Sequence, residues 1–366
     1  MDPGTPGGGV LERDRFHSGT GTGTGTGTDM DIKTAIAELT ARRDLSESDM
    51  EAVVREIMGG NATPAQVGAF LVALRMKGEQ VDEIAGAARA MRRYATRVPT
   101  QREVVDTCGT GGDMSNTFNI STAAAFIAAG AGLVIAKHGN RAMSGAVGGA
   151  DVLEALGVRI DLGPEQVAAC LEEVGMGFLF APRFHPAMRH VAAPRREIGV
   201  RTVFNLLGPL TNPAAAKAQL LGVFAREWVE SLAHTLGRLG SRRAMVVHGD
   251  DGLDELSLTA PSLVAELRDG AVHTYRFDPD SVGLRRCRPA DLAGGDAPHN
   301  ARIIRDVVAG QGTAAQMDIA LLNAAAALHV GGLADGIAAA LPLARAAVDN
   351  GAAAGKLEAL IEFTNR

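Results

Sequence analysis

A glycine-rich loop and a later basic segment are the residues of this chain best suited to chemistry. The loop, DTCGTGGD, spans residues 106–113, and the basic segment, KHGNR, begins 24 residues after the loop ends. Consecutive backbone N–H groups of such a loop can surround phosphate oxygens, because glycines have no Cβ atoms to obstruct them. The basic segment adds cations and hydrogen-bond donors for the same anion. The two segments predict a site for a heavily phosphorylated small molecule.

Three carboxylates accompany these anion-binding residues. Asp113 closes the glycine loop, where its charge is unfavourable beside an anion unless a divalent cation or a ligand hydroxyl lies between them. Asp254 and Glu255 follow another apolar run and would repel each other at short range without a metal ion. A solvated acidic loop is the alternative for this pair. Mg²⁺ prefers carboxylate and phosphate oxygens, so we expect it here.

Polar residues at the start of the next predicted helix supply further contacts. Asn119, Ser121 and Thr122 fit an ordinary N-cap, and a helix N-terminus can also bind an anion. Cys108 borders the glycine loop, but no base is placed beside it, so a small buried residue is the better interpretation. His185 and Arg195 lie beside an apolar run, where either side chain alone would usually be structural.

The elements that must position these residues change in period near residue 98. Residues 31–95 are helical throughout, with clear helix starts at Ser46 and at Thr63-Pro64. Beyond them, short apolar runs alternate with helical stretches, which predicts a largely parallel sheet covered on both faces. Asp269-Gly270 predicts a hairpin attached to that sheet. The apolar runs are residues 104–105, 133–136, 178–180, 220–224 and 244–247, and the helices are residues 121–131, 149–156, 164–174, 316–329 and 333–348.

The fold class is therefore α/β, with a small all-helical domain and a large domain built on a mainly parallel central sheet. We assign residues 30–98 to the helical domain, and residues 99–193 and 217–366 to the α/β catalytic domain. Residues 194–216 contain many turn-forming residues, so we expect them to cross back to the helical domain. A cleft at such a crossing is a usual place for a ligand.

The composition excludes several classes of function. The 366 residues are 46% hydrophobic, which is enough for a large core. A formal net charge of -6 argues against general binding to nucleic acids or anionic membranes, because both need a basic surface. No stretch is long and apolar enough to span a bilayer. The three cysteines form no C-x-x-C pair and suit a reducing compartment, so we expect a cytoplasmic protein.

Residues 1–29 differ from the rest of the chain and end in a Gly-Thr alternation. Such a composition buries nothing, so we expect disorder. A dinucleotide-binding fingerprint is excluded, because Thr26 stands where the third glycine of G-x-G-x-x-G belongs. Met30 begins an amphipathic segment, and we expect it to be the natural start, with the preceding extension having no function.

Six segments together closely resemble the anthranilate phosphoribosyltransferases of tryptophan biosynthesis. They are residues 106–113, 119–122, 137–144, 185–195, 205–213 and 254–255, and the likeness runs from Met30 to the C-terminus in the same order. The resemblance implies a helical domain hinged to an α/β domain, as in nucleoside phosphorylases and phosphoribosyltransferases. It also implies a homodimer formed through the helical domain.

The resemblance further implies a role for each matching residue. Phosphoribosyl diphosphate would contact Gly109, Thr110, Gly111, Gly112, Asp113, Asn119, Ser121, Thr122, Lys137 and Ser144. Anthranilate would contact Gly109, His138, Asn140, His185, Arg195 and Gly208, with Arg195 suited to pair with the substrate carboxylate. Mg²⁺ would be held by Ser121, Asp254 and Glu255. Many relatives have two serines after the basic loop, whereas this chain has Ser144-Gly145, so Ser144 and backbone groups must serve.

The implied reaction transfers the 5-phosphoribosyl group from phosphoribosyl diphosphate to the anthranilate amine. No residue is assigned as a catalytic base, because an arylamine is neutral at pH 7. One alternative is a pyrimidine nucleoside phosphorylase, which shares the architecture; the Asp254-Glu255 pair and the segments of His185 and Arg195 favour the transferase. A non-catalytic relative that binds nucleic acid is the other alternative, and the negative net charge counts against it.

Overall fold

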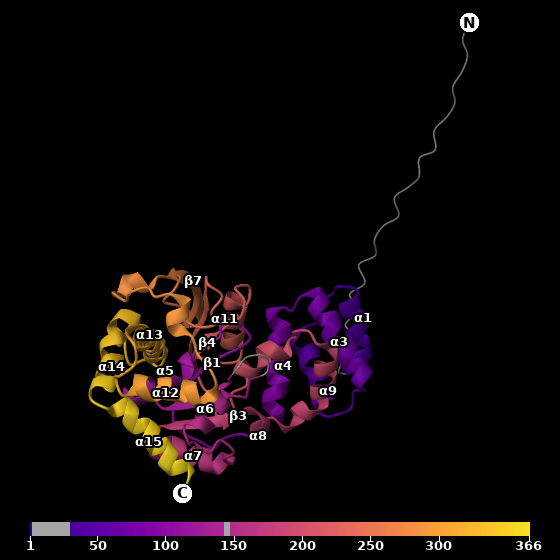
Figure 1. The fold of residues 1–366 in the computed structure, drawn as a ribbon. Coiled ribbons are helices and arrows are strands. Elements are labelled where there is room, and N and C mark those ends of the chain that lie inside the picture. Colours follow the sequence, from indigo (N-terminus) through magenta and orange to yellow (C-terminus); the bar gives the residue numbers. More distant parts are fainter. Residues whose placement is uncertain (2–29, 143–146) are drawn as a thin grey trace.

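The computed structural model describes Met1, residues 30–142 and residues 147–366. The Gly-Thr extension lies outside the described residues, and so does Ser144, which we predicted to bind phosphoribosyl diphosphate. A helical bundle stands beside a larger body in which helices cover a sheet (Figure 1). Within the described residues, no helix is long and apolar enough to cross a membrane.

The bundle begins where the sequence predicted helix starts. Its helices are α1 (Ile32–Thr40), α2 (Glu47–Met58), α3 (Pro64–Lys77) and α4 (Val81–Tyr94). The Ser46 side chain accepts a hydrogen bond from the backbone N–H of Asp49, which caps α2. Thr63 and Gln66 form a reciprocal capping box at the start of α3, with Pro64 at the first helical position. Both caps satisfy N–H groups that the first helical turn leaves unpaired, so both predictions are confirmed.

The larger body is built on one seven-stranded sheet among the described residues, in the order β3-β2-β1-β4-β5-β6-β7. The first five strands are parallel, and β6 and β7 are antiparallel. Asp269 and Gly270 have positive φ values of 52° and 81°, which a two-residue hairpin turn requires. The predicted hairpin is confirmed. The strands are β1 (Val105–Gly109), β2 (Ile135–Gly139), β3 (Met176–Phe180), β4 (Ala218–Gly222), β5 (Arg243–Gly249), β6 (Ser262–Arg268) and β7 (Ala271–Phe277).

Helices cover both faces of the sheet, as the alternating pattern predicted. Several were expected, while α11, α12 and α15 were not among the predicted helices. The helices of this body are α5 (Ile120–Gly130), α6 (Gly149–Ala155), α7 (Pro164–Glu173), α8 (Ala181–Phe184), α11 (Trp228–Arg238), α12 (Ala297–Val308), α13 (Ala314–Val330), α14 (Ile337–Asp349) and α15 (Ala352–Thr364). α13 packs on α5 and α14, and this group forms a core with one face of the sheet.

The segment around residue 194 is more regular than its turn-forming residues suggested. α9 (Arg189–Ile198) contains Pro194, and the short α10 (Phe204–Leu207) follows it. A proline inside a helix removes one N–H donor and so costs the helix a hydrogen bond. Val191 and Pro194 are both buried, and α9 packs against α3 and α2, so tertiary contacts outweigh the lost hydrogen bond.

The helical bundle shares a hydrophobic core with the other face of the sheet. One cluster of buried residues runs from Phe70 in α3 to Leu232 in α11 and Val246 in β5. Each fully buried side chain of this size contributes about 1.5–3 kcal/mol relative to its exposed state. Arg89 and Arg92 of α4 add hydrogen bonds to backbone carbonyls at the end of α11. The bundle and the sheet are therefore joined by a packed contact between α4 and α11.

An ion pair between β6 and α13 predicts a pH-dependent contribution to stability. Glu266 Oε1 lies 2.8 Å from His329 Nε2, and this hydrogen bond raises the pKa of His329 and lowers the pKa of Glu266. The contribution of Glu266 is full above about pH 4.5 and is lost as pH falls through its lowered pKa. The contribution of His329 is full below about pH 6.5 and is lost as pH rises through its raised pKa.

We therefore expect Glu266→Gln to lower Tm most between about pH 4.5 and 6.5, where both partners are charged. Thermal unfolding of the variant and the wild type at pH 5.5 and pH 9 measures the difference. An equal loss of Tm at both values would contradict the ion pair.

Candidate active site at the carboxyl ends of the strands

The predicted site residues gather at one edge of the sheet. The glycine loop follows β1, the basic segment overlaps the end of β2, and the loop with Asp254 and Glu255 follows β5. These three strands are parallel, so their carboxyl ends meet at the same edge. Open α/β sheets bind ligands at this edge.

The glycine loop wraps around the carboxylate of Asp254. The backbone N–H of Gly111 donates to Asp254 Oδ2 at 2.9 Å. Gly111 and Gly112 have φ values of +66° and +80°, a conformation that other residues rarely adopt. A Cβ on Gly109 would lie 2.5 Å from Asp254 Oδ2, and a Cβ on Gly222 would lie 1.5 Å from the Asp254 carbonyl oxygen. The glycines of both strand ends are thus required by the close approach of Asp254.

Glu255, Ser121 and Lys137 form a connected group beside this loop. Ser121 and the charge of Lys137 both lower the pKa of Glu255 against the effect of its burial, so both residues lie close to its carboxylate. Lys137 Nζ lies 3.2 Å from Ser121 Oγ and 2.5 Å from the carbonyl oxygen of Thr107. The Lys137 side chain is buried, and burial lowers its pKa while nearby carboxylates oppose that shift. The structure therefore brings Gly111, Lys137 and the acidic pair into one network, as the sequence predicted.

The acidic pair fits a divalent cation. Burial raises the pKa of Asp254 well above its ordinary value, and the charges of Asp113 and Glu255 raise it further. Burial is also the main cause of the raised pKa of Glu255, which Lys137 opposes. A cation would relieve both effects. The described residues include no group of three or more His, Cys, Asp or Glu side chains able to hold a metal alone, so phosphate oxygens must complete the shell, as is usual for Mg²⁺.

Two buried histidines form the neutral part of the site. His138 Nε2 and His185 Nε2 lie 3.2 Å apart, and the backbone of Gly208 is close enough to the His138 ring to raise its pKa slightly. Burial, together with the neighbouring His185, lowers the pKa of His138 to about 3, and burial lowers the pKa of His185 to about 4. Both rings are uncharged at pH 7. A Cβ on Gly208 would point into open space, so its surroundings leave room for a ligand.

The remaining predicted residues have different surroundings. Thr110 Oγ1 accepts from the backbone N–H of Phe224, and the buried Thr122 Oγ1 has no hydrogen-bond partner. Asn119 is the N-cap of α5, but its side chain donates to the carbonyl oxygen of Val147 instead of capping the helix. An ordinary N-cap is therefore the wrong interpretation of the Asn119 side chain, which is held by tertiary contacts.

Arg195 and Asn140, both expected near anthranilate, have other contacts than the histidine pair. The Arg195 guanidinium lies 5.5 Å from the centre of the Phe204 ring, and Asn140 is exposed with its Oδ1 accepting from the N–H of Arg141. Among the described residues, neither side chain forms a hydrogen bond with His138 or His185. Cys108 is buried with its pKa raised by that burial, which agrees with a structural role.

Sequence reasoning missed residues that hold these loops from a distance. Asp106 accepts from the backbone N–H of His138 at 3.1 Å and from Asn212 Nδ2 at 2.8 Å. Arg201 donates to the carbonyl oxygen of Gly112 at 2.5 Å and stacks on Phe224. Asp106 is the first residue of the glycine loop, which is the one local signal; the groups to which Asn212 Nδ2 and the Arg201 guanidinium donate are more than 75 residues away.

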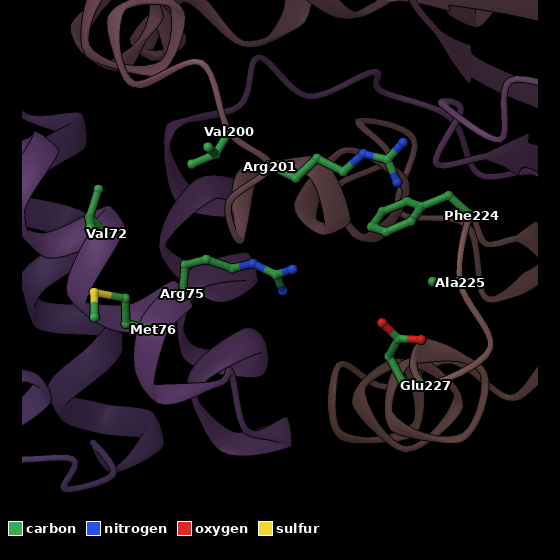
Figure 2. A pocket seen from close by; sticks show the side chains of 8 residues that line it. All are labelled: Val72, Arg75, Met76, Val200, Arg201, Phe224, Ala225 and Glu227. Carbon is green, nitrogen blue, oxygen red and sulfur yellow. The ribbon is translucent and has the colours of Figure 1, made fainter.

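A cavity of about 720 Å³ opens between the helical bundle and the sheet body. Figure 2 shows Arg75 of α3 and Glu227, at the start of α11, on opposite walls, with Arg201 and Phe224 above them. The wall residues are Val72, Arg75, Met76, Val200, Arg201, Phe224, Ala225 and Glu227. Since Phe224 contacts Thr110 and Arg201 contacts Gly112, the cavity borders the glycine loop.

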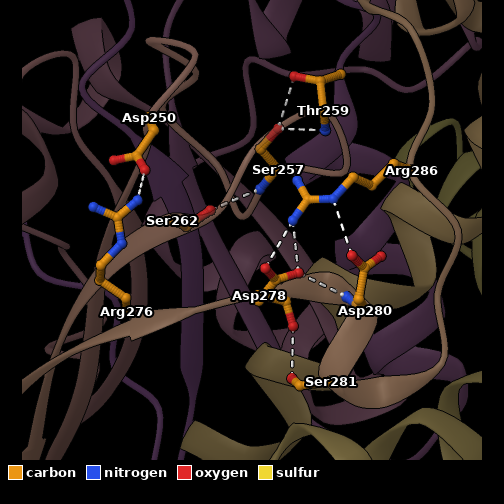
Figure 3. A network of polar contacts seen from close by, with 9 residues as sticks. All are labelled: Asp250, Ser257, Thr259, Ser262, Arg276, Asp278, Asp280, Ser281 and Arg286. Carbon is orange, nitrogen blue, oxygen red and sulfur yellow. Dashed lines mark hydrogen bonds and ion pairs between the residues drawn. The ribbon is translucent and has the colours of Figure 1, made fainter.

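A polar network includes Asp250 and Ser257, which lie on the loop that carries the acidic pair (Figure 3). Arg276 forms an ion pair with Asp250, and the N–H of Ser257 donates to Ser262 Oγ at 3.0 Å. Arg286 binds Asp278 at 2.8 Å and Asp280 at 3.1 Å. The first two contacts attach the loop after β5 to β7 and β6, and those of Arg286 stabilise the segment that follows β7.

Comparison with known proteins identifies the family. Residues 33–95 match the helical bundle domain of a glycosyl transferase family, and residues 101–354 match its a/b domain. An anthranilate phosphoribosyltransferase of Moorella thermoacetica is 57% identical over 91% of this chain and 98% of its own length. The chain belongs to the anthranilate phosphoribosyltransferase family. Its fold, a helical domain beside a mostly parallel α/β domain, is the one we predicted.

Other anthranilate phosphoribosyltransferases agree with this assignment. The enzyme of Thioalkalivibrio sulfidiphilus is 56% identical over 91% of this chain and 99% of its own length. The crystal structure of the Thermus thermophilus enzyme has a TM-score of 0.86 at 44% identity, covering 91% of this chain and 99% of that one. The Saccharomyces cerevisiae enzyme, solved in complex with PRPP and Mg, has a TM-score of 0.84 at 28% identity, covering 91% of this chain and 98% of that one.

Proposed function

We propose that this chain transfers the 5-phosphoribosyl group from phosphoribosyl diphosphate to anthranilate, in tryptophan biosynthesis. The products are N-(5-phosphoribosyl)anthranilate and diphosphate. The observation that carries the proposal is the single network joining Gly111, Asp254, Glu255, Ser121 and Lys137 at the strand ends. A glycine loop, the buried cation of Lys137 and an acidic pair of which Glu255 is buried together suit a metal-bound diphosphate. Relatives more than half identical to the chain carry the name of this activity.

Each side of the site has its own substrate. We assign phosphoribosyl diphosphate to the glycine loop, the start of α5 and Lys137, because these supply N–H donors and a cation. Mg²⁺ would be held by Ser121, Asp254 and Glu255, and when bound it neutralises charge on the departing diphosphate. Anthranilate is assigned to the side of His138, His185, Gly208, Asn140 and Arg195. A relative in yeast has been solved with 4-fluoroanthranilate.

The residues promote the reaction by positioning and charge stabilisation. The amine nitrogen bonds to C1 of the ribose while the bond from C1 to the diphosphate oxygen breaks, and the amine then loses a proton. Positive charge develops on the ribose, and negative charge on the diphosphate is stabilised by backbone N–H groups and Lys137. His138 and His185 are neutral, so they offer hydrogen bonds without repelling or attracting the developing charge. No residue is assigned as a general base.

We further propose that residues 30–98 and 194–216 form one domain that closes over residues 99–193 and 217–366. The packing of α9 on α3 and α2 supports the first grouping, and the cavity of Figure 2 supplies the space for closure. Closure would exclude water, which could otherwise hydrolyse the activated ribose. We also propose a cytoplasmic homodimer formed through the helical domain. Sedimentation analysis tests the proposed dimer.

A fluorescence assay tests the proposed reaction. Anthranilate emission should fall when the protein, phosphoribosyl diphosphate and Mg²⁺ are combined, and omission of any one should leave it constant. Thymidine and phosphate, the substrates of the alternative activity, are tested in parallel. Phosphorolysis of thymidine without consumption of anthranilate would replace the proposed function with that of a nucleoside phosphorylase.

A further inference from the structure

Asn323 is a polar residue buried in the middle of α13, a helix whose surroundings are otherwise apolar. Its side chain is fully buried between Leu322 and Ala324 in the sequence, and residues 324–327 are all alanine. Burying an amide costs free energy unless its hydrogen bonds are replaced. A leucine here would fill similar space without that cost. The position of Asn323 is therefore explained by what its amide binds, not by packing.

The amide of Asn323 holds both polar groups of the Leu256 backbone. Leu256 N–H donates to Asn323 Oδ1 at 3.0 Å, and Asn323 Nδ2 donates to the Leu256 carbonyl oxygen at 3.0 Å. The second Nδ2 proton is directed to the carbonyl oxygen of Ile319, one turn earlier in α13, also at 3.0 Å. Two bonds to one residue fix its orientation as well as its distance. The peptide bond from Glu255 to Leu256 is thus fixed to a rigid helix.

The other end of the same loop is fixed by Asp251. Its Oδ1 accepts from the N–H of Leu253 at 3.2 Å, and its Oδ2 accepts from Ser257 Oγ at 2.6 Å. Asp254 in turn packs against Gly222 so closely that no Cβ could be added. The acidic pair therefore lies on a short segment that is held by Asn323 and Asp251 and packs directly against Gly222. Such support matters because two neighbouring carboxylates repel each other when both are charged.

We propose that Asn323 is a positioning residue for the acidic pair, fixing the Leu256 backbone so that Asp254 and Glu255 are presented together to metal-bound diphosphate. This inference rests on the proposed function, because it concerns the group that the pair would bind. Residues that orient metal-binding side chains typically change metal affinity or activity by 10- to 100-fold when replaced. Asn323 acts through the backbone and does not itself contact substrate.

The test compares Asn323→Leu with wild type by calorimetric titration of phosphoribosyl diphosphate, in Mg²⁺ and in EDTA. We expect Kd in Mg²⁺ to rise roughly 10- to 100-fold in the variant, with Kd in EDTA unchanged. Thr235→Val is the matched control, because Thr235 is a buried polar residue of α11 whose hydroxyl bonds only within its own helix. Its two Kd values should equal those of wild type.

Hydrogen exchange in the wild-type protein supplies a measurement that needs no variant. If Asn323 binds the Leu256 backbone as described, the amide of Leu256 exchanges as slowly as the buried amides of α13. Rapid exchange would overturn the proposal. An Asn323→Leu protein that folds and keeps the wild-type gain in affinity from Mg²⁺ would also overturn it, as would equal weakening in Mg²⁺ and in EDTA. If Mg²⁺ fails to strengthen binding to wild type, the assigned metal site of the proposed function is wrong instead.

Discussion

Replacing Asp254 and Glu255 together with alanine should abolish phosphoribosyl transfer at ordinary Mg²⁺ concentrations. Both carboxylates lie at the strand ends beside the Gly111 N–H and Ser121, where the diphosphate is proposed to leave. Removing a single preorganised charge-stabilising group usually costs 10²–10³ in rate, so we expect kcat/KM to fall by at least about 1,000-fold. Initial rates from anthranilate fluorescence across a range of Mg²⁺ concentrations measure the loss.

A second acidic pair provides the control for this experiment. Asp278 and Asp280 bind Arg286 near the same loop but lie outside the proposed site (Figure 3). Their double alanine variant should keep near wild-type rates. Removing Asp254 and Glu255 also leaves the buried Lys137 without two carboxylates that offset its burial, so thermal unfolding of the variant must show that it stays folded at the assay temperature. Near-normal turnover by the Asp254/Glu255 variant would refute their role in holding metal.

Gly222→Ala should be the most disruptive replacement of a glycine at the strand ends. The added Cβ would lie 1.5 Å from the Asp254 carbonyl oxygen and 2.4 Å from its carbonyl carbon, so the backbone must shift. Overpacking of this kind costs about 1–3 kcal/mol or more, and here it displaces a residue proposed to hold the metal. We expect a lower Tm together with a fall in kcat/KM of about 100-fold, measured by thermal unfolding and by the fluorescence assay.

A control replacement at a glycine with free space around it distinguishes the effect of this clash from the effect of introducing an alanine. Gly355 lies within α15, and a Cβ placed on it meets no atom within 4 Å. Gly355→Ala should therefore raise stability by about 0.5–1 kcal/mol, because alanine favours a helix over glycine. Its activity should be unchanged. A Gly222→Ala protein as stable and active as Gly355→Ala would show that the loop adjusts without cost.

The sequence predicted best those features that depend on neighbouring residues. The capping residues Ser46 and Thr63 and the Asp269-Gly270 turn are local, because their hydrogen bonds and φ values involve residues within a few positions. The gathering of the glycine loop and the acidic pair also followed from a rule about parallel strands. Both conclusions needed no knowledge of side-chain contacts.

Contacts between distant segments could not be predicted in the same way. Asn323 and Leu256 are 67 positions apart, and nothing in an alanine-rich helix indicates that one amide binds a loop backbone. The closeness of Gly222 to Asp254 depends on how the β5 loop folds back over β4. Pro194 favoured an irregular segment, yet burial against α3 produced a helix. In each case tertiary packing decides the outcome.

The contact between α4 and α11 has a consequence for how the cleft can move. Arg89 and Arg92 bond to the carbonyl oxygens of Arg238 and Leu239, and the two helices share one apolar cluster. α3, by contrast, faces the start of α11 across the cavity. Rotation of the bundle would leave the α4 edge nearly stationary and swing the α3 edge farthest. In the proposed closure, the α4 contact would therefore serve as the hinge, and Arg75 would lie at the edge that moves most.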